Sequence, residues 1–171
     1  AVTLSDTTVA AADLNALDTA TSGVIDASSV ATLTGRADAV ATAYASSGIS
    51  GLGGENVTIS GLATAASDLN AINAATTGTI DASVVITLMG TLSAVATAYA
   101  SSGISGLGDE DVSLSDTTVA AADLNALDAK TSGTIDASSV TTLTGSLSAV
   151  TTAYASSGIS GLGNAAVTLS D

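Results

Sequence analysis

The hydrophobic and polar positions of this chain repeat at a fixed interval. A Val-x-Leu/Ile-Ser run opens each repeat, at Val2, Val57, Val112 and Val167, and alanine-rich segments with apolar residues at helical spacing follow the first three. A fixed period of this length is typical of a stacked array, in which one unit cannot bury its apolar face alone. We therefore expect a single elongated domain with repeats at 2–56, 57–111 and 112–166 and the start of a fourth at 167–171.

Within each repeat, a short β-type run is followed by an amphipathic segment twice over. Apolar or small residues at i, i+4, i+7 and i+11 from Ala10 predict a helix over about residues 8–21. The second half predicts a helix over about residues 36–47, with Tyr44 on its inner face. We expect an Asp or Ser to cap each helix N-terminus.

Glycine follows each predicted helix, as a residue of left-handed backbone conformation does at many helix ends. These glycines are Gly23, Gly78 and Gly133 after the first helix and Gly48, Gly103 and Gly158 after the second.

Parallel strands joined by crossovers of a dozen or more residues form right-handed units in nearly all cases. The pattern thus predicts an α/β fold: a right-handed repeat solenoid with short parallel strands on one side and short helices on the other, and two strand-helix units per repeat. A competing interpretation joins Val140 to Tyr154 in one long helix, with Thr134-Ile135-Asp136 as the second strand. Three threonines and Gly145 in that run favour a strand followed by a helix.

Composition and charge narrow the function. The 171 residues include 46% hydrophobic side chains, which excludes a disordered chain, and carry a net charge of −14 with Arg36 and Lys130 as the only cations. Nucleic-acid binding is not expected, because phosphate contacts need a basic surface. No apolar run approaches the ~18 residues of a membrane span, and no basic leader opens the chain. Because neither end carries a polar capping unit, we expect a longer array or chains that join end to end.

Candidate catalytic groups are scarce. The chain has no His and no Cys, so its many serines have no evident base to activate them. Most acids also vary between repeats: Asp18 becomes Asn73, and Asp6 becomes Gly61. We expect no enzyme site and no cofactor.

Two sets of acids are candidate calcium ligands, since Ca²⁺ prefers oxygen donors. The first set recurs within Ile-Asp-Ala-Ser in all repeats, at Asp26, Asp81 and Asp136; the second is the loop Asp109, Glu110 and Asp111. The favoured interpretation gives the first set a structural role, in which each Asp bonds the backbone of a turn. It makes the acidic loop a solvated face.

Two further residue types recur and are assigned structural roles. Asn15, Asn70 and Asn125 lie inside the first helix, where Asn is mildly unfavourable. A buried amide bonded to a neighbouring turn explains their recurrence better than an exposed position does. Tyr44, Tyr99 and Tyr154 are the only large aromatic residues, and we expect each ring to pack between units with its hydroxyl bonded at the rim.

The strings Asp123–Asp128, Ser132–Ser138 and Ala153–Gly158 resemble the tandem repeats of giant bacterial surface or secreted proteins, of which marine cyanobacteria carry many. This resemblance covers the whole chain and implies an extracellular, structural or adhesive role at the cell surface. We therefore expect a non-enzymatic structural module or filament, whose partners are copies of itself or further repeats. The alternative is a calcium-dependent adhesin or binding module.

Overall fold

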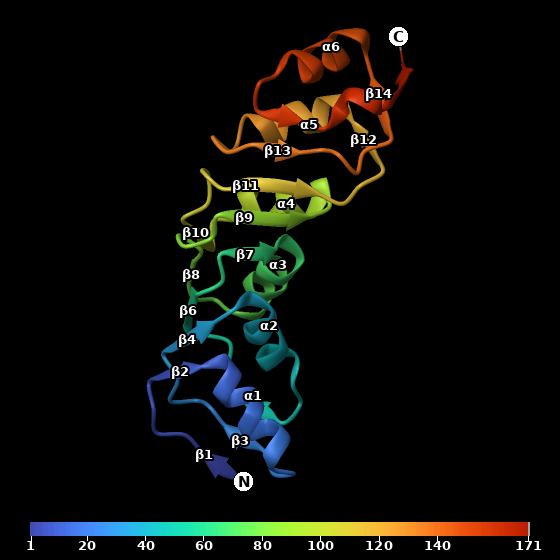
Figure 1. The fold of residues 1–171 in the computed structure, drawn as a ribbon. Coiled ribbons are helices and arrows are strands. Elements are labelled where there is room, and N and C mark those ends of the chain that lie inside the picture. The colour runs from blue at the N-terminus through green and yellow to red at the C-terminus, as the bar shows by residue number, and fades with distance from the viewer. Residues whose placement is uncertain (171) are drawn as a thin grey trace. The chain divides into compact units, whose positions relative to one another are not determined.

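The computed structural model describes residues 1–170 and confirms an α/β fold of parallel strands and helices (Figure 1). Six α-helices occur in this range: α1 (Ala11–Ala20), α2 (Ala37–Ala45), α3 (Ala66–Ala75), α4 (Leu92–Ala100), α5 (Ala121–Asp128) and α6 (Leu147–Ala155). A short 3-10 helix, η1, spans Leu162–Asn164. The chain divides into two compact units, which are described separately. Unit 1 comprises Ala1–Val85 and Ser101–Gly106, and unit 2 comprises Ile86–Ala100 and the described chain from Leu107 onward.

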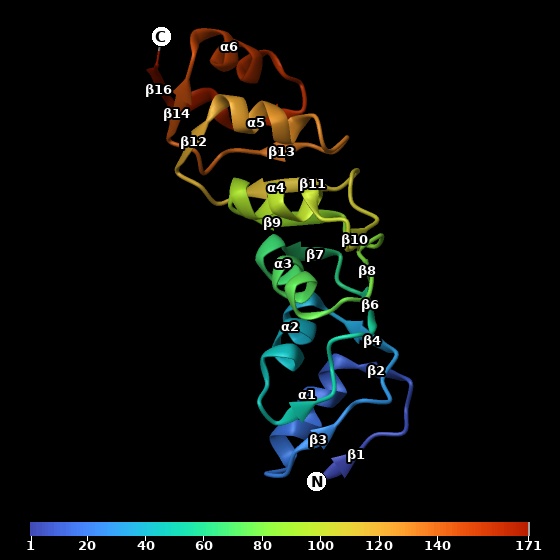
Figure 2. The ribbon, with the colours of Figure 1, turned by 180° about the vertical axis from the view of Figure 1, so that it is seen from behind.

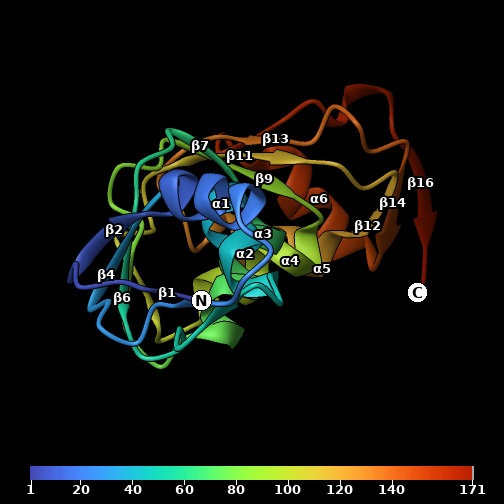
Figure 3. The same ribbon diagram turned by 90° about the horizontal axis from the view of Figure 1, so that it is seen from below.

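Unit 1 contains two parallel sheets. The smaller has the order β1 (Val2–Thr3), β3 (Ile25–Asp26), β5 (Ile49–Ser50). The larger has the order β2 (Thr8–Ala10), β4 (Thr32–Gly35), β6 (Asn56–Ile59), β8 (Ile80–Asp81), β10 (Ile104–Ser105). Strand β7 (Ala63–Ala65) leads directly into α3. Seen from below, β2, β4 and β6 lie along one side of unit 1 and α1 and α2 lie on another (Figure 3).

Unit 2 repeats this arrangement. One parallel sheet contains β9 (Thr87–Gly90), β11 (Asp111–Leu114), β13 (Ile135–Asp136) and β15 (Ile159–Ser160) in that order. A second contains β12 (Thr118–Ala120), β14 (Thr142–Gly145) and β16 (Ala166–Leu169). Helices α5 and α6 pack against one another beside these strands (Figure 2).

Within each unit, a strand pairs with the strand two places away from it in chain order. Leu33 of β4 is opposite Val57 of β6, and Val57 is opposite Ile80 of β8. Strand β6 opens the second repeat, so it pairs both with the preceding repeat and with its own. Strand β11 does the same at the start of the third repeat, between β9 and β13. Sheets therefore cross the boundaries between repeats.

The core consists of small aliphatic side chains from strands and helices. Ile25, Leu33 and Val57 are buried on the strands, and the helices cover them with residues such as Leu14 and Val40. In the longer strands, such as β4 and β6, buried apolar residues alternate with more exposed polar ones, as a pleated strand requires. Alanine on the helices lets the layers approach closely.

The structure decides between the two interpretations of the second half-repeat. Strand β14 precedes α6, so Val140 to Tyr154 is not one long helix. Thr142 and Thr144 are β-branched and suit the strand, while Gly145, at φ 142°, ends it. Ile135–Asp136 is nevertheless also a strand, β13, which the favoured interpretation omitted.

Two details of the expected strands are wrong. Residues 8–10 form β2 instead of the first helical turn, because Thr8 and Val9 are β-branched. The strands of each unit also form two sheets instead of one, since a turn after Asp26 redirects the chain between β3 and β4.

The expected helix ends also differ. Helix α1 has Ala10 as its N-cap, so Asp6 does not cap it, whereas the Ser146 hydroxyl accepts a hydrogen bond from the Ala149 N–H and does cap α6. The glycines after the helices are not in the left-handed region. Gly78 is instead required by space, because a Cβ there would collide with the backbone carbonyl of Glu55.

Candidate functional site

The recurring Asp-x-Ser residues form tight turns between strands. Asp26 Oδ1 accepts a hydrogen bond from the Ser28 N–H at 3.1 Å, and the same bond joins Asp81 to Ser83 at 3.0 Å. Hydrogen bonds from the serine side chain and then from its N–H lower the pKa of Asp26 and of Asp81. Asp136 makes the equivalent bond to Ser138 at 2.9 Å. This is the side-chain-to-backbone bond that the spacing predicts.

Two of the six candidate calcium ligands line a common groove. Asp111 and Asp136 border a groove of about 360 Å³ on unit 2, together with the hydroxyl-bearing residues Thr87, Ser113, Thr134 and Ser160. Within residues 1–170, no group of three or more His, Cys, Asp or Glu side chains is placed to hold a metal ion. Calcium binding therefore stays a prediction, and the structural feature in its favour is the groove shared by Asp111 and Asp136.

The acidic loop is not a uniformly solvated face, because its glutamate is buried. Glu110 is 1% exposed and Glu55, its counterpart in the preceding repeat, is 3% exposed, whereas Asp109 and Asp111 are exposed. The Glu55 carboxylate accepts hydrogen bonds from the Gly53 N–H at 2.8 Å and the Gly54 N–H at 3.1 Å. Glu110 accepts the same two bonds, from the N–H groups of residues 108 and 109. We call residues 53–55 and 108–110 the Glu loops.

A tyrosine of the same repeat faces each buried glutamate. The Tyr44 hydroxyl donates a hydrogen bond to Glu55 Oε1. Burial, and next this bond to a carboxylate, raise the pKa of Tyr44 above its ordinary value of 10. Burial, and next the neighbouring Glu110 carboxylate, raise the pKa of Tyr99 as well. Yet Tyr99 Oη and Glu110 Oε1, both buried, have no hydrogen bond of normal geometry within the described chain.

The third tyrosine differs because its repeat lacks the glutamate. Ala165 occupies that position, and the Tyr154 hydroxyl donates instead to the carbonyl oxygens of Leu162 and Ala165, at 3.3 and 3.4 Å. The Tyr154 side chain is exposed, unlike its two counterparts.

Each Glu loop is fastened to the next repeat. The Thr76 hydroxyl donates to the Glu55 carbonyl oxygen at 2.7 Å, and the Thr77 N–H donates to the Gly53 carbonyl at 2.9 Å. Gly78 leaves no space for a Cβ beside the Glu55 carbonyl. Thr131 and Gly133 repeat these contacts at Glu110. The loop therefore joins the end of one repeat to the end of the first helix in the next.

Asn15, Asn125 and Asp18 join the two helices of their own repeats. The half-buried Asn15 side chain donates to the Ala39 carbonyl at 2.9 Å, and Asn125 makes the same bond to Ala149. The Ser46 hydroxyl donates to Asp18 at 2.6 Å. In the second repeat Ser101 donates to Asn73 Oδ1 at 2.9 Å, so an amide oxygen serves in place of the carboxylate.

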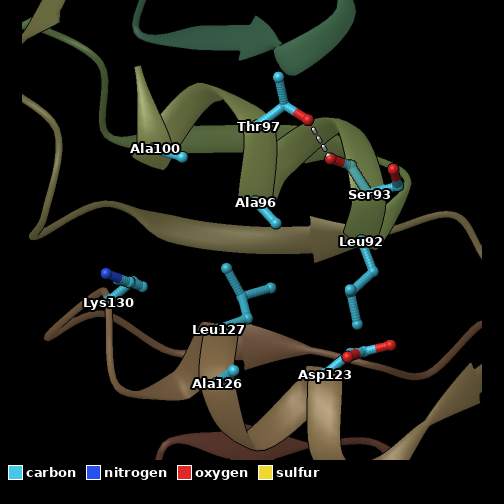
Figure 4. Close-up of a pocket in the computed structure, with 9 residues that line it drawn as sticks. All are labelled: Leu92, Ser93, Ala96, Thr97, Ala100, Asp123, Ala126, Leu127 and Lys130. Atoms are coloured by element: carbon cyan, nitrogen blue, oxygen red, sulfur yellow. Dashed lines mark hydrogen bonds between the residues drawn. The ribbon is translucent and has the colours of Figure 1, made fainter. Parts of the chain in front are cut away.

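A groove of about 510 Å³ on unit 2 lies between α4 and α5 (Figure 4). Leu92 of α4 points toward Asp123 of α5, while Leu127 points back toward Ala96. The Leu92 N–H donates to Asp116 Oδ2 at 2.7 Å, which fixes the first turn of α4 beside the strand β12 that leads into α5. The walls are mainly aliphatic, and Lys130 is the one cation on them.

No family model, no curated protein and no solved structure matches this chain. Among the described helices, none is long and apolar enough to cross a membrane.

Sequence reasoning missed the buried glutamates and their partners on the next repeat. A signal for them was present in the sequence, since a threonine and then a glycine follow Glu55 at the same interval as they follow Glu110. Chemically, the arrangement holds a carboxylate against backbone donors and joins successive repeats.

Proposed function

We propose that this chain is a non-enzymatic structural module of an extracellular surface protein or filament, whose repeats stack as one right-handed solenoid and continue end to end. The observation that carries this proposal is the shared strand at each repeat boundary. Strand β6 pairs with β4 of the preceding repeat and with β8 of its own. A repeat that shares its first strand with its neighbour is built for an array.

The strand registers support a particular solenoid. One turn carries the chain from Val57 to Ile80, and a second carries it from Ile80 to Ile104. The next repeat begins at Val112. The number of residues from Ile104 to Val112 equals the number from Ile25 of β3 to Leu33 of β4, two consecutive strands that form adjacent sides of one turn. Under this proposal each repeat makes two turns and one further side.

The uses of the recurring acids support a structural role. Asp26 and its counterparts bond turn backbone, and Glu55 and Glu110 bond loop backbone beside a tyrosine. These acids act on the protein's own N–H and O–H groups. The extracellular setting rests on composition and on the resemblance to tandem surface repeats.

A lengthened chain tests the proposal. One further copy of residues 57–111, inserted after residue 111, adds two turns and part of a third, and at 4.7–4.9 Å between strands the maximum dimension rises by at least ~9 Å. Small-angle X-ray scattering measures this dimension. The control carries a Gly/Ser segment of the same length, which also raises the maximum dimension but adds the high-angle scattering of a disordered chain, whereas a folded extra repeat adds none. An extra repeat that leaves the maximum dimension unchanged contradicts the solenoid.

A calcium-dependent adhesive module is the second candidate. The observation in its favour is the groove that Asp111 and Asp136 share. Both carboxylates already accept a backbone hydrogen bond, from Thr134 and Ser138 respectively. Melting with calcium and with EDTA separates the two candidates, as set out in the Discussion.

A further inference from the structure

A patch on unit 2 exposes apolar side chains that are covered elsewhere in the chain. Leu147, the first residue of α6, is 58% exposed, whereas its counterpart Ala37 in α2 is buried. Val167 and Leu169 of β16 are exposed, although the equivalent residues of β6 and β11 are buried. We call Leu147, Val167 and Leu169 the α6 patch.

A groove on unit 1 leaves apolar side chains uncovered that are buried in the third repeat. It measures about 330 Å³ and lies along β2 and α1, with Leu4, Val9 and Leu17 in its wall and Asp6 and Asp13 at its rim. These three apolar side chains are half-buried, whereas their counterparts in the third repeat, Leu114, Val119 and Leu127, are buried. We call this the α1 groove.

The chain already contains the contact that would fill the α1 groove. Residues 4–18 are identical in sequence to residues 114–128, and α6 is identical to α4 except that Thr151 replaces Ala96. In unit 2, α4 lies against residues 114–128, with Leu92 directed at Asp123 and its N–H bonded to Asp116. A second copy's α6 patch therefore presents to the α1 groove almost the same residues that α4 presents within unit 2.

We infer that a second copy of this chain docks its α6 patch into the α1 groove, with Leu147 between Leu17, Asp13 and Asp6. This inference rests on the proposed function and names its joint. The contact is heterologous, because the two copies use different surfaces, so it builds chains of molecules or rings instead of closed dimers.

Charge sets the conditions for this joint. Each copy carries a net charge of −14, so approach is opposed at low salt and favoured once salt shortens the range of repulsion. Lys130 lines the groove between α4 and α5, but the equivalent residue beside the α1 groove is Ala20. The joint therefore has no cation at this position to offset the negative charge. We expect association to strengthen as salt rises.

Sedimentation velocity of the full chain over a concentration series, at low salt and at about 0.5 M salt, tests the inference. Wild type is expected to form species larger than dimers. Leu147→Glu places a negative charge against Asp6 and Asp13 and removes apolar contact, so association weakens by at least about tenfold. Leu147→Lys also removes the apolar contact but places a positive charge beside these two aspartates, so its association weakens less than that of Leu147→Glu. Ile86→Glu and Ile86→Lys are matched controls, because Ile86 is equally exposed at 58% and lies just before β9.

The outcomes are distinct. Association that falls with Leu147→Glu, and stays at the wild-type level in both Ile86 variants, supports the joint. Association that is equal in wild type and Leu147→Glu overturns it, and so does a wild type that stays monomeric at every concentration and salt. Neither result touches the lengthening experiment, which needs no association and tests the proposed function by itself. Circular dichroism of each variant confirms that α6 still folds.

Discussion

Replacing Glu55 by alanine tests whether a Glu loop holds successive repeats together. The side chain is 3% exposed and accepts hydrogen bonds from the N–H groups of Gly53 and Gly54 and from the Tyr44 hydroxyl. Alanine removes the acceptor of all three donors. The same loop carries the carbonyl that Thr76 binds, so its distortion reaches the next repeat.

The expected loss follows from the number of donors left without a partner. Each buried donor without an acceptor costs about 1–3 kcal/mol. Some of this cost is recovered when the loop relaxes and water enters, so we expect Glu55→Ala to lower the free energy of unfolding by about 3 kcal/mol. Glu55→Gln keeps one acceptor oxygen and the shape but loses the charge, and we expect a loss of about 1 kcal/mol. Against a typical total of about 5–15 kcal/mol, both losses are measurable.

Urea unfolding at pH 7, followed by far-ultraviolet circular dichroism, measures both losses. Asp109→Ala is the control, because Asp109 belongs to the other Glu loop but is exposed; we expect a change within about 0.5 kcal/mol. A Glu55→Ala variant no less stable than Asp109→Ala would refute the reasoning. Unequal slopes of the unfolding curves would indicate that the repeats unfold separately, and the midpoints of the separate transitions are then compared.

Four further predictions follow from the same contacts. Tyr44→Phe removes a hydrogen bond to a buried carboxylate and lowers the free energy of unfolding by about 1 kcal/mol, whereas Tyr154→Phe, whose exposed side chain donates only to carbonyl oxygens at 3.3 and 3.4 Å, costs less than half of that in the same urea assay. Because the folded pKa values of Tyr44 and Tyr99 are raised, their contribution to stability is complete below pH 10 and is lost as the pH rises through the folded pKa, which ultraviolet titration follows. Val57→Ala costs about 2 kcal/mol at a residue 1% exposed, and Val167→Ala, at the same repeat position but 44% exposed, costs under about 0.5 kcal/mol. Calcium and EDTA are expected to leave the melting temperature unchanged; a rise with calcium that Asp136→Asn abolishes would favour the adhesive module.

The sequence period was enough to predict an α/β class with parallel strands, because strand-type runs alternate with alanine-rich segments of helical spacing. It did not predict the shortest strands, such as Ile25–Asp26 and Ile49–Ser50, since two residues cannot display an alternation. The strand register was hidden as well. The interval between paired residues, such as Leu33 and Val57, does not divide evenly into the repeat interval, such as that from Val2 to Val57. Pairing partners therefore fall in different parts of successive repeats.

The buried glutamates show a second limit of sequence reasoning. A carboxylate in a glycine-rich loop is ordinarily solvated, and only the path of the backbone places the Gly53 and Gly54 N–H groups around Glu55. The partner of the asparagines differed from the expected one, since a bond to a neighbouring turn was expected and the partner is a helix. An unfavourable residue that recurs inside a helix indicates a specific bond, and Asn15 and Asn125 make one to the following helix.

Two segments of identical sequence show which structural features depend on the segment itself and which depend on the elements packed against it. Residues 4–18 and 114–128 have the same sequence, and α1 and α5 both begin at the corresponding alanine. Yet Leu17 is half-buried while Leu127 is 2% exposed, and the difference is α4, which covers Leu127. Local sequence thus sets the element, and the adjoining helix sets the burial. The residues of the α1 groove are the same as those that α4 covers in unit 2. The groove therefore keeps the residues needed to bind a helix such as α4, although no helix of unit 1 covers it.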